Sequence, residues 1–471
     1  MKKFNKDKYL RKLKLKRYWQ NNSRYFYIGI PCLLCLVLGI YFAYSKFFVT
    51  SEEEVVRTTV GEFIYGDIIM TPYVDGQYSS IFPEKKTGIN IEKVVCDNGV
   101  TASWDEDKWG LYATNLSKRT KCSVYFVTPA SCGINDNVSC INSREGLAAL
   151  ANEVNNGDNK SGKIIYLTSD LDLGGKFDSE GNALDGNISW TPIGTDSNPF
   201  SGTFDGNGHI ISNMYVSTDA NAALFNYINN GKIESFGIES SFIKSKSNIA
   251  AGIVSEGYGV AVRNVYNKAT IDGKKNSAGI AGVVSGKIFN LYNGGTIKAA
   301  TQFGGGIVGY YIIGDEKNSI SNVFNYGKIE GELQFGGIVG GLQGTINNSY
   351  NIGNVTGGYG AGGIVGQMFM TTNPKVYNNY NMGSIDVGGG VIGADYESSN
   401  CYVVKNNNYL SGTASYGIDF SKSNAGAEPL SEDEMPSVIS VINGDNAFVE
   451  DTNNINNGYP ILKWQAEREN N

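Results

Sequence analysis

The chain has 471 residues, a formal net charge of −7 and only one histidine, His209, so any site that needs two histidines is excluded. Hydrophobic residues make up 41% of the chain and aromatic residues 12%, which excludes a disordered protein. The sequence contains 60 Gly and 52 Asn but only 10 Pro. Because Gly and Asn tolerate left-handed turns, this composition predicts a mainly β fold with many tight turns.

Charge is distributed unevenly along the chain. Residues 1–24 carry ten Lys or Arg and one acid, whereas residues 50–471 carry 28 basic and 45 acidic residues. Phosphate binding needs a concentrated basic surface, so the acidic bulk argues against nucleic acid as a partner.

The basic head is followed by 21 uncharged residues, from Tyr25 to Ser45. This length predicts a transmembrane signal-anchor helix over 25–49, with membrane lipid as its partner. Lys and Arg on one flank predict a cytoplasmic segment over 1–24 and an extracellular bulk, which describes a single-pass protein of the cell membrane. The alternative is a cleaved signal peptide, for which Ala43 and Ser45 would form a poor cleavage site.

The seven cysteines are consistent with export. Cys32 and Cys35 fall inside the expected span. Four of the others allow three disulfide connectivities, and proximity in the chain favours Cys96–Cys122 and Cys132–Cys140, with Cys401 left free. A zinc site is not expected, because these cysteines lack CxxC spacing and supporting histidines.

Two segments precede the repetitive part of the chain. Residues 55–128 alternate short apolar and polar runs, which predicts a small disulfide-linked β-domain. Its Trp104 and Trp109 could bind sugar rings, although completing a small core is the favoured interpretation. Residues 132–162 are predicted to form a capping helix region, with Ser143 as N-cap and Gly157 beyond the end of the helix. The buried face of this helix is expected to carry Leu147, Leu150 and Val154.

The remaining sequence is built from repeats. A Gly-rich motif such as GGIVG recurs at intervals of 26–31 residues, and an Asn-x-aromatic-Asn motif lies between successive copies. The repeat-structural glycines are Gly252, Gly279, Gly306, Gly337, Gly363 and Gly390. The second motif begins at Asn264, Asn290, Asn322, Asn348 and Asn378.

Each repeat contains β runs too short to bury their apolar sides alone, so successive repeats must stack. We expect a right-handed parallel β-helix over 163–410, with Ile and Val columns inside and Asn ladders at corners. Residues 411–471 are expected to form a C-terminal helix and terminal strand cap. A propeller is the alternative, but its repeats are longer, at about 40–50 residues.

These repeats resemble the GLUG-type repeats of bacterial surface adhesins, which form β-helices of the filamentous-haemagglutinin group. The segments WTPIG (190–194), FSGTFDGNGHIISNMYV (200–216) and NNGYPILKW (456–464) are similar to flanking parts of such proteins. The resemblance covers about residues 140–465. It implies exposure at the cell surface and adhesion, but it carries over no binding residue.

Residues suited to catalysis or metal binding are few. One coil along the solenoid, Asp272 meets no acid near position 299 and Glu330 meets Thr356, so no paired carboxylates are expected there. The segment 178–186 loosely suggests a calcium loop, but a solvated loop is favoured because the glycine is misplaced. His209 is interpreted as part of a turn. We therefore expect no metal, no cofactor and no catalytic residue.

The recurring aromatic residues are the best candidates for ligand binding. Tyr266, Tyr292, Tyr350 and Tyr380, with Phe324 in the same series, could form a surface ladder that stacks on sugars. The alternative, which we favour, is that they pack in or beside the core. Taken together, the sequence predicts a non-enzymatic adhesion or structural module that binds extracellular glycan or host protein. An extracellular polysaccharide-degrading enzyme on a β-helix scaffold is the alternative function.

Overall fold

The structure of the protein is a computed structural model. It describes residues 11, 14, 53–57, 64–70, 78–81, 87–96, 102–105, 109–113 and 120–469, with gaps at 315–317, 370–371 and 396–401. The chain divides into two compact units, Met1–Val127 and Thr128–Asn471. Cys32, Cys35 and Cys401 lie outside the described residues.

The expected fold class is corrected in one respect. Within the ranges that the structure describes, no helix is long and apolar enough to cross a membrane. The expected span at 25–49 itself lies outside those ranges. The described part of the chain is mainly β and contains a parallel solenoid.

The first unit contains two antiparallel sheets with the strand orders β1-β2-β7-β4 and β3-β6-β5. The predicted Cys96–Cys122 disulfide is confirmed, and it joins directly opposite residues of β4 and β7. Trp104 and Trp109 meet edge to face with ring centroids 5.0 Å apart, and both pack against the small core. The strands are β1 (Glu53–Arg57), β2 (Ile64–Met70), β3 (Tyr78–Ile81), β4 (Asn90–Cys96), β5 (Ala102–Asp105), β6 (Gly110–Ala113) and β7 (Thr120–Val127).

The second unit begins with a cap over the first solenoid strands. The predicted Cys132–Cys140 disulfide is confirmed and joins η2 (Pro129–Ser131) to β8 (Val138–Ile141) through the residue after η2. Helix α2 (Arg144–Asn155) begins where predicted, because the Ser143 hydroxyl accepts a hydrogen bond from the Gly146 N–H at 3.2 Å. The predicted apolar face of the helix is buried against the solenoid core.

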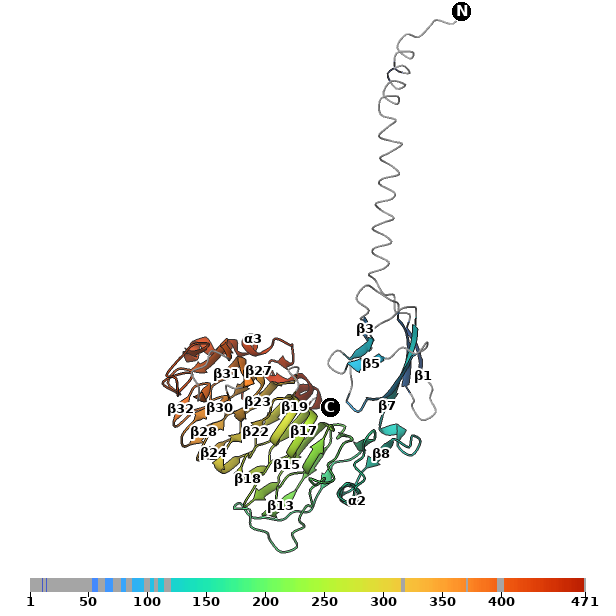
Figure 1. The fold of residues 1–471 in the computed structure, drawn as a ribbon, viewed down its shortest axis with the longest axis horizontal. Helices are drawn as coiled ribbons and strands as arrows, with labels where there is room; N and C mark the ends of the chain where they lie inside the picture. Colours follow the sequence, from blue (N-terminus) through green and yellow to red (C-terminus); the bar gives the residue numbers. More distant parts are fainter. Residues whose placement is uncertain are drawn as a thin grey trace, which may run out of the picture. The chain divides into compact units, whose positions relative to one another are not determined.

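Behind this cap, the chain winds into a parallel β-solenoid, as the repeats predicted (Figure 1). Stacked strands of successive coils form the faces of the solenoid. The first strand of each coil lies on the first face and the next strand on the second face. The long strands β17 (Val254–Asn267) and β19 (Ala281–Asn293) belong to both faces. The first face also contains β14 (Phe225–Asn229), β22 (Val308–Tyr311), β26 (Val339–Leu342), β30 (Val365–Met368) and β33 (Ile392–Asp395). The second contains β15 (Lys232–Glu239), β23 (Ile320–Asn325), β27 (Thr345–Asn351), β31 (Lys375–Asn381), β34 (Val403–Lys405) and β35 (Asn407–Leu410).

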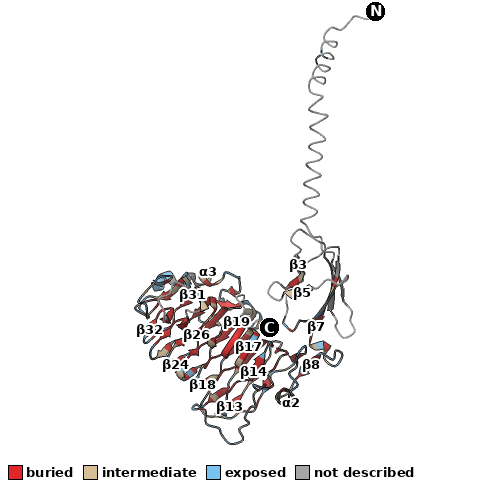
Figure 2. Ribbon diagram, in the orientation of Figure 1, coloured by how far each residue is buried: buried red, intermediate tan, exposed pale blue. Residues whose placement is uncertain are grey.

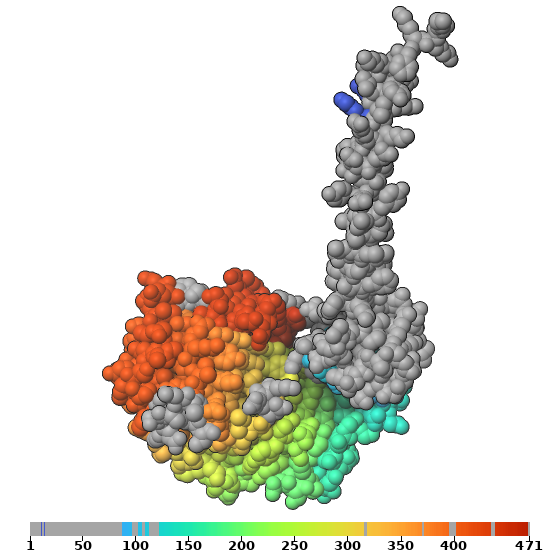
Figure 3. Space-filling view, turned by 45° about the horizontal axis from the view of Figure 1, so that its top comes forward, coloured from blue at the N-terminus to red at the C-terminus, as the bar shows by residue number. Residues whose placement is uncertain are grey.

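Two further sheets complete the coils, which the sequence pattern does not distinguish from each other. The third face contains β13 (Tyr215–Thr218), β16 (Phe242–Ser245), β18 (Thr270–Lys275), β20 (Ile297–Gln302), β24 (Ile329–Gly331) and β28 (Val355–Gly357). The short fourth sheet contains β21 (Gly304–Gly305), β25 (Phe335–Gly336), β29 (Ala361–Gly362) and β32 (Gly388–Gly389). Figure 2 shows that the solenoid strands are largely buried, and Figure 3 shows the coils as successive bands of colour.

The Gly-rich motif lines the core. Ile307, Ile338 and Ile364 are fully buried, and the Ile307 N–H donates to the Ile338 carbonyl at 2.9 Å and the Ile338 N–H to the Ile364 carbonyl at 3.1 Å. The predicted apolar column is therefore confirmed. The preceding glycine has no room for a side chain: a Cβ on Gly337 would lie 2.1 Å from the Gly363 carbonyl oxygen. The same close approach occurs at Gly252, Gly279, Gly306 and Gly363, while Gly390 lies against the Tyr409 ring.

The Asn-x-aromatic-Asn motif makes a corner of each coil. Its first Asn adopts a left-handed conformation, with φ between 50° and 57° at Asn264, Asn290, Asn322, Asn348 and Asn378. Its second Asn is buried and forms the predicted ladder. Each amide donates to the next at 2.8 Å, from Asn267 through Asn293, Asn325 and Asn351 to Asn381.

Candidate functional site

The recurring aromatic residues form a continuous ladder on the second face. The strand register places Tyr266, Tyr292, Phe324, Tyr350 and Tyr380 one above another on adjacent coils. The first three ring pairs have centroids 4.8, 5.1 and 4.9 Å apart and interplanar angles of 8°, 13° and 2°. These separations match the distance between neighbouring strands, so the backbone positions the rings for stacking.

The ladder is not exposed to solvent. Its five side chains are at most 1% exposed, because residues 432–469, here called the strap, lie over them. Burial raises the pKa of the Tyr266, Tyr292, Tyr350 and Tyr380 phenols above the ordinary value. The favoured interpretation, that these residues pack in or beside the core, is therefore confirmed, and the interpretation as an exposed ladder that stacks on sugars is wrong.

The strap runs back along the solenoid, from β31 toward β19 and β17 (Figure 1). The ring centroids of Phe448 and Tyr350 lie 5.8 Å apart, and those of Trp464 and Tyr292 lie 5.7 Å apart. The Trp464 indole N–H also donates a hydrogen bond to the Asn290 carbonyl at 2.9 Å. Arg468 donates to the Tyr292 hydroxyl at 3.0 Å. The strap comprises η4 (Glu432–Ser437), α3 (Val438–Ile442), β37 (Phe448–Val449), β38 (Ile461–Leu462) and α4 (Lys463–Glu469).

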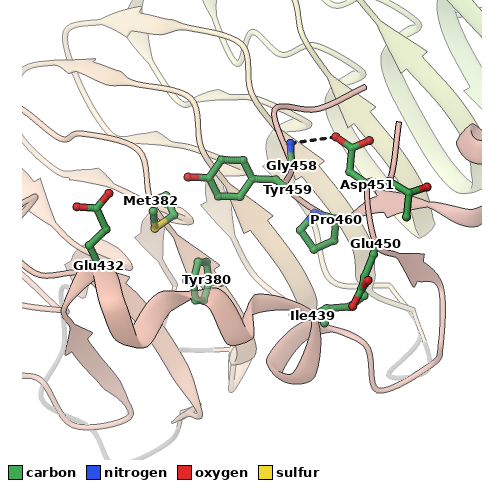
Figure 4. Close-up of a pocket in the computed structure, with 10 residues that line it drawn as sticks. Tyr380, Met382, Glu432, Ile439, Glu450, Asp451, Gly458, Tyr459 and Pro460 are labelled. Atoms are coloured by element: carbon green, nitrogen blue, oxygen red, sulfur yellow. Dashed lines mark hydrogen bonds between the residues drawn. The ribbon is translucent and has the colours of Figure 1, made fainter. Parts of the chain in front are cut away.

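A pocket of about 510 Å³ opens where the strap meets the last ring of the ladder; we call it the ladder-end pocket. Two tyrosine rings line the pocket. Tyr380 is only 1% exposed, whereas Tyr459 is half-buried and therefore the more accessible of the two. Met382 lies between these rings and Glu432, while Glu450 lies on the opposite side (Figure 4). Its residues are Tyr380, Met382, Glu432, Ile439, Glu450, Asp451, Thr452, Gly458, Tyr459 and Pro460.

The three carboxylates of the ladder-end pocket differ in their partners. Asp451 accepts hydrogen bonds from the N–H groups of Ile455, Asn456 and Gly458 at 2.7, 2.6 and 3.0 Å, so it shapes the loop that carries Tyr459. Glu432 and Glu450 are exposed, and their carboxylates have no hydrogen bond or ion pair with any residue that the structure describes. An aromatic ring beside free carboxylates can both stack on a sugar and accept hydrogen bonds from its hydroxyl groups.

A column of charged residues on the third face pairs acids with cations. The third face stacks Lys244, Asp272, Lys298, Glu330 and Thr356 in order, so the predicted neighbour of Glu330 is confirmed. Lys244 forms an ion pair with Asp272 at 2.7 Å. Opposite charges therefore alternate along this face, and the column contains no adjacent carboxylates.

One charged cluster on the second face escaped the sequence analysis. Asp205, Glu234 and Arg263 occupy successive coils, and the Arg263 guanidinium donates to the Glu234 carboxylate. Lys232 lies 3.1 Å from the same carboxylate. Because Asp205 and Glu234 are each 1% exposed, a polymeric substrate has no access to this pair of acids.

The residues considered for metal binding or catalysis have structural contacts. Asp178 accepts hydrogen bonds from the N–H groups of Glu180 and Asn182, both at 2.9 Å, and thereby closes a turn. His209 contacts Asp170 through Nδ1 at 3.0 Å at the surface. In the described part of the chain, no group of three or more His, Cys, Asp or Glu residues is arranged to hold a metal ion.

Comparison with known proteins does not place the chain in a family. No family model and no curated protein matches the chain. Among solved structures, the chain is similar to one described as "IgA1 Protease", with 14% identity and a TM-score of 0.40. The match covers 75% of this chain but only 27% of that one.

Proposed function

We propose that this protein is an exported, non-enzymatic adhesion module of the cell surface, and that it binds extracellular glycan in the ladder-end pocket. The observation that carries the proposal is the combination, in one open pocket, of the half-buried Tyr459 ring with the carboxylates of Glu432 and Glu450, which have no partner among the residues that the structure describes. The two disulfides support an exported location, because such bonds persist in oxidising compartments.

The solenoid supports this function as a rigid scaffold. Its coils are joined by continuous Ile and Asn columns, and the strap is held to them at several rungs. The pocket walls therefore come from two segments that are already fixed before ligand arrives, which lowers the entropic cost of binding. The resemblance to GLUG-type repeat proteins agrees with an adhesive role.

The test is a glycan array probed with the purified full chain, followed by titration calorimetry of the best ligand. Tyr459→Ala should weaken binding at least tenfold, because stacking on the accessible ring is lost, while Tyr459→Phe should retain most of it. Tyr359→Ala is the matched control, since Tyr359 is a 50% exposed tyrosine that does not line this pocket. Absence of glycan binding, or cleavage of a bound polysaccharide, would overturn the proposal.

A further inference from the structure

The charged residues that line the ladder-end pocket, among those that the structure describes, are all acidic. Its ionisable lining residues besides the tyrosines are Glu432, Glu450 and Asp451, and neither Lys nor Arg is among the lining residues that the structure describes. Asp451 already accepts three backbone N–H groups. The two glutamates have no comparable partner among the described residues, so both carboxylates are open to a ligand in the pocket.

The arrangement of these charges is as informative as their sign. Glu432 and Glu450 lie at opposite ends of the pocket, with the Tyr459 and Tyr380 rings between them (Figure 4). A protonated amine can contact a carboxylate and the face of an aromatic ring at the same time, and both contacts favour positive charge. A uronic acid or a sulfated sugar would instead be repelled by both glutamates.

From this geometry we propose that the ligand is an oligosaccharide of unacetylated amino sugars, whose protonated amines pair with Glu432 and Glu450. The inference rests on the proposed glycan-binding function and deepens it by naming the class of sugar. A pocket of about 510 Å³ is large enough for a short oligosaccharide, so amines on separate sugar units can reach the two ends. An N-acetyl group removes the charge and with it both contacts.

The test compares the glucosamine trimer with the N-acetylglucosamine trimer by calorimetry on the purified full chain. We expect the glucosamine trimer to bind at least tenfold more tightly, with an affinity that falls as salt is raised. Glu432→Gln and Glu450→Gln should each reduce this preference at least threefold without altering the melting temperature. Glu332→Gln is the control, because Glu332 is exposed and does not line the pocket.

The outcomes separate this inference from the function on which it rests. Equal binding of the two trimers, or tighter binding of the acetylated one, would overturn the amino-sugar assignment and leave glycan binding intact. Failure of the chain to bind any glycan on the array would overturn both. A preference for the amine that survives both glutamate substitutions would also contradict the assignment, since the charge would then be recognised elsewhere.

Discussion

At the scale of single residues, the corner asparagines carry an unusual number of hydrogen bonds. Asn325 donates to Asn351 and accepts from Asn293, both at 2.8 Å, and it also donates to the Gly327 carbonyl at 2.9 Å and accepts from the Gly327 N–H at 3.2 Å. All four bonds lie at a fully buried side chain. The side chain therefore closes its own turn and links its coil to both neighbours.

We predict that Asn325→Ala lowers the free energy of unfolding by about 3 kcal/mol, because buried polar partners lose their hydrogen bonds. Chemical denaturation followed by circular dichroism measures the change. Asn142→Ala is the control, since Asn142 is exposed and precedes the cap helix. Similar small losses for both variants would show that the ladder contributes little.

The Ile column permits a second residue-scale prediction. Ile338→Asp places an unpaired carboxylate in a fully buried site between Ile307 and Ile364, at a cost of several kcal/mol. Lys328→Asp replaces a solvent-accessible ion pair with Glu330 by two like charges that water and salt screen, a change worth about 1 kcal/mol or less. Thermal melts should show a large decrease for the first variant and almost none for the second. Equal, small decreases would contradict the core-lining role of the motif.

At the scale of elements, the strap and the ladder stabilise each other. The rings of the ladder form an apolar column. Phe448, Leu462 and Trp464 of the strap pack against this column and cover it. The partners are far apart in sequence: Trp464 donates to a carbonyl 174 residues earlier in the chain. Neither element could bury this apolar surface alone.

We predict that Trp464→Ala loosens the strap without unfolding the coils. Loss of the indole should cost about 3 kcal/mol locally, because it packs on Tyr292 and Tyr266. Hydrogen exchange should then accelerate in residues 461–469 while β19 and β23 stay protected. Trp464→Phe keeps a ring and should change exchange much less; uniform acceleration throughout the solenoid would contradict a separable strap.

This long-range packing explains which features the sequence could predict. Four features follow from local motifs or from their repetition, and the structure contains all of them. They are the period of the repeats, the Ile column, the Asn ladder and the cap helix that begins after Ser143. The sequence favours packing of Tyr266 and Tyr292 in or beside the core, but it does not identify the strap that covers them, because the strap has no repeat of its own. For the same reason, Glu432, Glu450 and Tyr459 could not be recognised as pocket residues before the strap was placed.

At the scale of the whole molecule, the buried phenols predict alkaline unfolding. Burial holds the pKa of Tyr266, Tyr292, Tyr311, Tyr350 and Tyr380 above the ordinary value of 10. Above about pH 10 the unfolded chain loses these protons while the folded chain keeps them, so each group lowers stability by about 1.4 kcal/mol per pH unit. Below pH 10 their stabilising contribution is fully present.

The measurement is the melting temperature between pH 8 and pH 11.5, with phenolate absorbance recorded in parallel. We expect a steep fall in melting temperature above pH 10 and a cooperative rise in phenolate absorbance that coincides with unfolding. Gradual ionisation of all tyrosines near pH 10, with the fold retained, would contradict the burial of the ladder.

The strap has a consequence for how this protein can change in evolution. Solenoids commonly gain or lose whole repeats, and removing one coil here would leave the Asn and Ile columns able to rejoin. The strap, however, meets particular rungs: Trp464 contacts Tyr292, and Asn456 donates to the Tyr350 hydroxyl at 2.7 Å two coils further on. A missing coil would shift every later partner by about 4.8 Å, the width of one strand. The strap can therefore match only one number of repeats between Tyr266 and Tyr380. It places no such limit on the number of coils before Tyr266.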